Sequence, residues 1–135
     1  MYAQAFGDIL INRLNITLKG QPSLHDVNTF LEKLEIELVF LSPGFVMILD
    51  ISKIGAICTE LKDILTKIII ISLYYGMRSS IFISENDTQI ITHKTLNLTR
   101  PFKPIIVNSI SKATIEADKV EETMKKIALL QLISA

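Results

Sequence analysis

Apolar and polar residues alternate over residues 14–19, Leu-Asn-Ile-Thr-Leu-Lys, and Gly20 follows them. Successive side chains of a strand point to opposite faces, so this pattern predicts a strand with one buried and one exposed face. Residues 5–11 favour an earlier strand that runs antiparallel to it. The chain is therefore expected to begin with two antiparallel strands.

Residues 23–41 show helical spacing. Ser23 is a capping residue, and Asp26 follows three positions later, which is typical of a helix start. Apolar residues then recur every three or four positions, at Val27, Phe30, Leu31, Leu34 and Leu38. A Pro-Gly pair ends this helix, and the unbroken apolar run at 45–49 predicts a central parallel strand covered by helices on both faces.

Residues 57–75 are apolar at helical positions, and Gly76 is placed to end the helix. The β-branched run inside this segment would also suit a strand. A helix is preferred because two neighbouring parallel strands need a crossover connection between them.

The rest of the chain continues to alternate. It predicts short strands at 80–84 and 104–107, a helix at 88–98, and a long helix from Ser111 onwards. The order predicts an α/β fold with a mostly parallel sheet of about five strands, an antiparallel N-terminal strand and about four flanking helices. With 135 residues, the chain is expected to form a single domain over 1–135.

Composition and charge narrow the classes of function. Fourteen Lys and Arg balance fourteen Asp and Glu, so no overall field favours nucleic acid as a partner. A single cysteine excludes an intramolecular disulfide and a Cys-based zinc site, and it suits a cytoplasmic protein. No apolar span approaches the roughly 20 residues of a membrane helix, and no metal or cofactor signature is present, so neither stable membrane insertion nor a metal or cofactor is expected.

Three local features carry a resemblance to a known family: the strand that ends before Gly20, the strand-loop-helix segment 48–59, and the step from residue 106 through 109 into the last helix. In these features the chain resembles the STAS domain, the fold of bacterial anti-sigma-factor antagonists. In that family an Asp-Ser pair opens a helix, and phosphorylation of the Ser blocks partner binding. Cys58 and Thr59 occupy these two positions, so the resemblance implies Thr59 as a candidate phosphorylation site.

Each candidate residue also has a structural interpretation. Asp50 and Ser52 are expected just beyond the carboxyl end of the 45–49 strand, where open α/β sheets bind ligands, but such residues often bond only loop N–H groups. Cys58 beside a helix start either has an activated thiol or is a small buried residue. The hydroxyl of Thr59 either accepts phosphate or caps the helix.

The expected function is that of a non-catalytic regulatory module that binds a protein partner around Asp50, Ser52, Cys58 and Thr59. The alternative is a carrier of an apolar small molecule or lipid, suggested by the aliphatic segment 57–75; an enzyme has the least support. A carrier requires an internal cavity, whereas a docking module requires a filled core and an exposed surface. The sequence leaves open the identity of the partner and whether the chain forms a homodimer.

Overall fold

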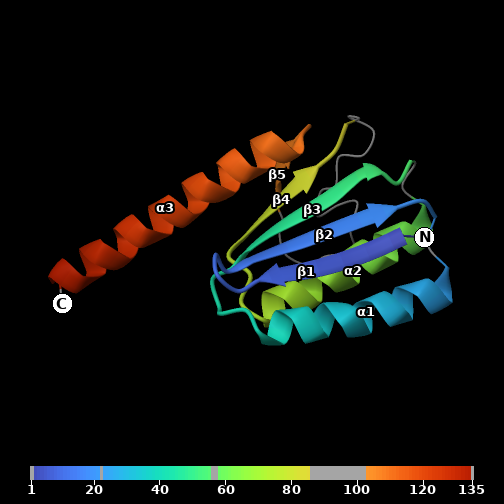
Figure 1. The fold of residues 1–135 in the computed structure, drawn as a ribbon, viewed down its shortest axis with the longest axis horizontal. Helices are drawn as coiled ribbons and strands as arrows, with labels where there is room; N and C mark the ends of the chain where they lie inside the picture. The colour runs from blue at the N-terminus through green and yellow to red at the C-terminus, as the bar shows by residue number, and fades with distance from the viewer. Residues whose placement is uncertain (1, 22, 56–57, 86–102, 135) are drawn as a thin grey trace.

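A computed structural model describes residues 2–21, 23–55, 58–85 and 103–134 (Figure 1). Its elements are, in chain order, β1 (Tyr2–Asp8), β2 (Arg13–Lys19), α1 (Leu24–Val39), β3 (Val46–Lys53), α2 (Thr59–Tyr74), β4 (Ser79–Ile83), β5 (Ile105–Val107) and α3 (Ile110–Ser134). The helix predicted at 88–98 lies outside the described residues. Three of the predicted helices therefore have a described counterpart.

The strands form one five-stranded sheet in the order β1-β2-β3-β4-β5. β1 is antiparallel to β2, and every other neighbouring pair is parallel. This confirms the mostly parallel α/β fold with an antiparallel N-terminal strand. It also confirms that the unbroken apolar run belongs to the central strand.

Helices cover the sheet on both faces, with α1 and α2 on one side and α3 on the other (Figure 1). Alternate residues of β3 belong to different cores: Met47, Leu49 and Ile51 join the core with α1 and α2. Val46 and Ile48 join the core with α3. A strand segment between two cores is apolar at every position, which explains why residues 46–49 of β3 show no alternation.

β2 is alternating because its two faces differ in cover. Leu14, Ile16 and Leu18 are buried in the core with α1 and α2. Asn15 and Thr17 point to the opposite face and are half-buried. α3 packs against β3, β4 and β5, so β2 lies beside the part of the sheet that α3 covers. The period-two pattern of β2 reflects this difference between its two faces.

The first strand is shifted relative to the expectation from sequence. It comprises Tyr2–Asp8, whereas residues 9–12 form the turn to β2. The Leu10 N–H donates to Asp8 Oδ1 at 3.1 Å, and Asn12 has a φ of 53°, a left-handed conformation typical of turns. Local turn hydrogen bonds therefore override the apolar character of Ile9, Leu10 and Ile11, which had suggested a strand.

Two predicted helix boundaries are confirmed. Ser23 is the N-cap of α1, and its Oγ accepts a hydrogen bond from the Asp26 N–H at 3.2 Å. Gly76 follows the end of α2 with a φ of 96°. The Gly76 carbonyl accepts a bond from the Gly44 N–H at 2.7 Å, which brings the loops before β3 and β4 into close contact.

Replacement of Gly76 by alanine is expected to destabilise the fold strongly. A Cβ at this position would lie 2.9 Å from Pro43 Cα, so backbone must move in addition to the left-handed strain. We expect Gly76→Ala to lower the free energy of unfolding by more than about 2 kcal/mol, measured by urea denaturation.

Gly20→Ala is the matched control. Gly20 also has a positive φ, of 76°, but a Cβ there would meet nothing within 4 Å. Strain alone predicts a cost of about 1–2 kcal/mol. Equal losses in the two variants would show that the approach of Pro43 to Gly76 does not matter for stability.

Candidate functional site

Asp50 and Ser52 lie within β3 and not beyond it, so their predicted position in a loop was wrong. Pairing with β2 continues through Thr17↔Asp50 to Lys19↔Lys53 and carries β3 four residues past the apolar run. β4 pairs only as far as Ile83, opposite Asp50. The end of β3 therefore extends beyond β4 at the carboxyl edge of the parallel strands.

The side chains of Asp50 and Ser52 lie on the same face of β3 and bond each other. The Ser52 N–H and hydroxyl both donate to Asp50 Oδ1, at 3.0 and 2.6 Å. Both residues are half-buried. One oxygen of the carboxylate is thus occupied within the strand, as the structural interpretation of this pair expects.

Cys58 and Thr59 lie at the start of α2. Cys58 is the N-cap and makes no side-chain capping bond, while Thr59 is the first helical residue and is exposed. Cys58 is half-buried against the core, and its Sγ lies 3.4 Å from Gln21 Oε1. The N-cap is therefore Cys58 and not Thr59, and the Cys58 side chain does not cap the backbone N–H groups of the first turn of α2.

Among the described residues, no group of three or more His, Cys, Asp or Glu side chains is arranged to hold a metal ion. His25 is exposed on α1. His93 lies outside the described residues. The part of the chain that the structure describes also contains no helix long and apolar enough to cross a membrane.

An ionic cluster that the sequence analysis missed anchors α3 to the sheet. Arg13, the first residue of β2, has a side chain that is only 8% exposed, and its Nη2 lies 3.0 Å from Asp118 Oδ1. The same guanidinium bonds Glu121 through Nε at 3.1 Å and through Nη2 at 2.8 Å. Arg13 and Asp118 are 105 residues apart, so no local pattern could have revealed the contact.

The electrostatics of the cluster favour the charged guanidinium. Burial lowers the pKa of Arg13, but hydrogen bonds from its N–H groups to Glu121 and Asp118, together with their negative charges, outweigh burial and raise the pKa above its ordinary value. Arg13 therefore carries its charge throughout the physiological pH range. The cluster joins the first residue of β2 to two carboxylates of α3, beside the packing of Ala113 and Ala117 against the sheet.

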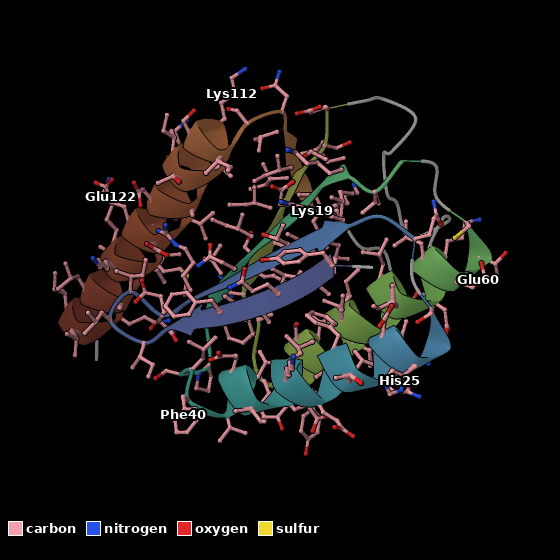
Figure 2. The ribbon with its side chains drawn as sticks, turned by 45° about the vertical axis from the view of Figure 1, so that its right-hand side comes forward. Lys19, His25, Phe40, Glu60, Lys112 and Glu122 are labelled. Atoms are coloured by element: carbon pink, nitrogen blue, oxygen red, sulfur yellow. The ribbon has the colours of Figure 1, made fainter. Side chains whose placement is uncertain are left out.

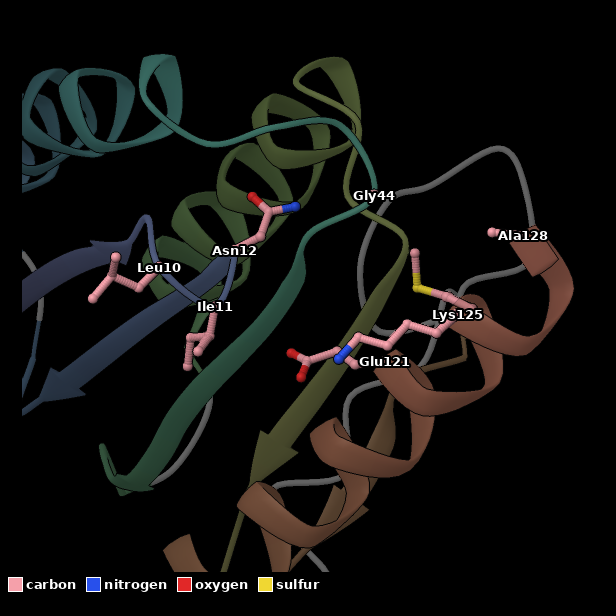
Figure 3. Close-up of a pocket in the computed structure, with 8 residues that line it drawn as sticks. Leu10, Ile11, Asn12, Gly44, Glu121, Lys125 and Ala128 are labelled. Carbon is pink, nitrogen blue, oxygen red and sulfur yellow. The ribbon is translucent and has the colours of Figure 1, made fainter. Parts of the chain in front are cut away.

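A groove lies beside this cluster, where α3 leaves the sheet (Figure 3). Its volume is about 420 Å³, and residues from the β1–β2 turn face residues of α3 across it. The turn is held by Asn12, whose Nδ2 donates to the Ser42 carbonyl at 3.0 Å and whose Oδ1 accepts from the Ser42 N–H at 2.8 Å. The groove wall is thus fixed from both sides, by Asn12 and by the Arg13–Glu121 contact.

Beyond the groove, α3 projects past the end of the sheet (Figure 1). Met124 of α3 lies next to the loop at Gly44, since its Cε is 3.2 Å from where a Gly44 Cβ would be. The large apolar side chains that follow are exposed, and they are Ile127, Leu129, Leu130, Leu132 and Ile133. Exposed apolar residues concentrated in one projecting helix are typical of a contact surface.

Comparison with protein-family models, curated proteins and solved structures found no match. The function of the site is therefore inferred from its own geometry. That geometry offers two separate surfaces: the polar carboxyl edge of the strands with the start of α2, and the outer side of α3.

Removal of the Arg13 charge is expected to loosen α3. Arg13→Met leaves Glu121 and Asp118 without their cation; because the side chain of Asp118 is 65% exposed, water compensates part of the loss. We expect a decrease of about 2 kcal/mol in the free energy of unfolding, below the 3–5 kcal/mol that a fully buried pair loses.

Lys67→Met provides the control, because Lys67 pairs with Asp63 on α2 at 3.2 Å with both side chains well exposed. Its loss should change stability by less than about 0.5 kcal/mol. Hydrogen exchange of the α3 amides should accelerate in Arg13→Met and stay unchanged in Lys67→Met. Unchanged exchange in both variants would refute an anchoring role for the cluster.

Proposed function

We propose that this chain is a non-catalytic, protein-binding regulatory module that docks its partner at the carboxyl edge of the sheet, around the end of β3 and the first turn of α2. The resemblance to anti-sigma-factor antagonists implies this class of function. The observation that carries the proposal is that apolar side chains form a packed core on each face of the sheet. A partner would therefore bind to the surface of the molecule.

The aliphatic residues of α2 are occupied by packing. Leu61, Ile64, Leu65 and Ile68 are all 0% exposed and belong to the core with β2 and β3. These residues had suggested a carrier of apolar molecules. These α2 side chains pack against the sheet. Nothing else among the described residues specifically favours a carrier.

The polar candidates suit recognition better than chemistry. The closest polar contact among them is the hydrogen bond from Ser52 Oγ to Asp50 Oδ1, and no histidine of the described residues bonds either group. A serine–carboxylate pair without a base lacks the arrangement of an activated nucleophile. The pair instead holds two side chains rigidly on one face of β3, which is useful for presenting a surface to a partner.

Thr59 gives this surface a means of control. It is exposed at the start of α2, where backbone N–H groups that the Cys58 side chain does not cap and the helix dipole favour negative charge. A phosphate on Thr59 would therefore be tolerated by the fold while adding charge where the partner docks. The proposed regulation is loss of partner binding on phosphorylation of Thr59.

The test compares Thr59→Glu with Thr59→Ala as baits in quantitative affinity capture from cytosol, followed by titration of the purified partner. Thr59→Glu should weaken binding at least about tenfold, equivalent to about 1.4 kcal/mol, because it adds a negative charge to the docking surface. Thr59→Ala should bind as the original chain does. Both should fold normally, since an exposed residue in the first helical turn contributes less than about 1 kcal/mol.

Thr29→Glu is the matched control, because Thr29 is an exposed helical threonine on α1. It should retain the partner. If no captured protein distinguishes Thr59→Glu from Thr29→Glu, the proposed docking surface is wrong.

A further inference from the structure

α3 has two opposite faces with different chemistry. Ala113 and Ala117 on the inner face are 0% exposed and pack against the sheet, and Val120 and Met124 continue this face while half-buried. The small alanines allow the helix backbone to lie close to β3 and β4. The inner face is thus occupied by the fold itself.

The opposite face carries a second regular stripe. Its members follow one another at spacings of four and three residues, so they share one side of the helix. This outer stripe consists of Ile115, Lys119, Glu122, Lys126, Leu129 and Ile133. Ile115, Leu129 and Ile133 are 53%, 60% and 81% exposed, and the side chains of Lys119, Glu122 and Lys126 are 68%, 70% and 72% exposed.

We propose that the outer stripe binds a second copy of the chain, with the two α3 helices antiparallel and related by a two-fold axis beside residue 124. In this arrangement residue 115 of one copy lies opposite residue 133 of the other. A two-fold axis makes every contact occur twice, so the stripe must be complementary to itself.

The stripe meets that requirement. Ile115 would face Ile133 of the second copy, which removes two exposed apolar side chains from water at each end of the contact. Glu122 would face Lys126 and form an ion pair on each side of the axis. Lys119 would face Leu129, where its aliphatic stem covers the leucine while its ammonium group remains in water.

The order of charges along the outer stripe favours a second copy of the chain as the partner and an antiparallel orientation of the two helices. A parallel pair in register would place Glu122 beside Glu122 and Lys126 beside Lys126, which is repulsive. Within one chain Glu122 and Lys126 already lie 3.6 Å apart, so the antiparallel pair extends an existing ion pair into a four-membered charge cluster. The apolar ends and the alternating central charges thus specify a second copy.

The helix is long enough and well placed for this contact. The stripe from residue 115 to residue 133 spans about 27 Å at the usual helical rise. Figure 1 shows α3 at the side of the molecule, with its C-terminal half projecting beyond the sheet. The contact is small and partly charged, so a dissociation constant in the micromolar range is expected.

This surface is distinct from the one proposed for the regulated partner. Figure 2 shows Glu122 of α3 and Glu60, next to Thr59, on opposite sides of the molecule. The dimer and the Thr59-dependent complex can therefore be tested and can fail independently.

The test uses charge reversal and complementation in the full chain. In a homodimer, Glu122→Lys brings two ammonium groups together at each central contact, and Lys126→Glu brings two carboxylates together there. Each variant alone should dimerise at least tenfold more weakly than the original chain in sedimentation equilibrium over a micromolar concentration series. In an equimolar mixture, a heterodimer of the two variants pairs an ammonium group with a carboxylate at both central contacts, so the mixture should dimerise about as strongly as the original chain.

The double variant Glu122→Lys with Lys126→Glu supplies a second rescue, within one chain. It exchanges the two charges within each chain, so an ammonium group again faces a carboxylate at both central contacts. Dimerisation of the double variant should therefore recover to that of the original chain. The ion pair within each chain is also kept, in reversed order, which separates the contact between copies from the contact within one helix.

Three further variants complete the design. Ile133→Asp should abolish dimerisation by placing a charge against Ile115 of the second copy. Asp63→Lys is the matched control, because it breaks an equivalent exposed ion pair, with Lys67 on α2, and should leave dimerisation unchanged. Thr59→Glu should also dimerise as the original chain does. Circular dichroism checks that all variants keep their helix content.

Recovery in the equimolar mixture and in the double variant, with both single variants weakened, supports the antiparallel pair. A chain that stays monomeric throughout the series overturns the proposal. So does a dimer that the single variants leave intact, or one that the double variant does not restore. A monomer that sediments with phosphatidylserine vesicles would overturn it too and would assign the outer stripe to a lipid surface.

Discussion

The guanidinium of Arg13 holds the two halves of this molecule together. It bonds Glu121 and Asp118 from the first residue of β2 and thereby joins the start of the sheet to the last helix. A nearly buried cation requires its carboxylates, so α3 is confined in both translation and rotation. The inner alanines are thus directed against the sheet and the outer stripe away from it.

The position of α3 determines which parts of the surface are polar and which are apolar. Because α3 packs against β3, β4 and β5, β3 is apolar along both of its faces at its start, and its polar residues Asp50 and Ser52 follow toward its carboxyl end. The carboxyl edge of the strands is therefore polar. The opposite end, where α3 continues past the sheet, is apolar. The proposed partner and the proposed second copy would therefore contact surfaces of different chemistry.

Much of the fold could be predicted because its elements have periodic signatures. The alternation of β2, the capping serine of α1 and the glycine after α2 each reflect constraints that act within a few residues. The errors occurred where a neighbour overrode the local pattern. Pairing with β2 extends β3 through Asp50 to Lys53, and turn hydrogen bonds remove the apolar residues 9–11 from β1. Of the candidate site, the exposure of Thr59 suits the expectation, whereas Asp50 and Ser52 belong to the strand.

The sequence by itself determined the class of fold, the central place of the apolar run and the helix boundaries at Ser23 and Gly76, because propensity, periodicity and capping are local. Only the tertiary structure decided that Arg13 anchors α3 and which side of α3 remains exposed. The helix carries two stripes with the same spacing, one that begins with alanines and one of charged and large apolar residues, and spacing alone does not say which one meets the sheet. That choice depends on a contact between residues more than a hundred positions apart, which has no periodic signature in the chain.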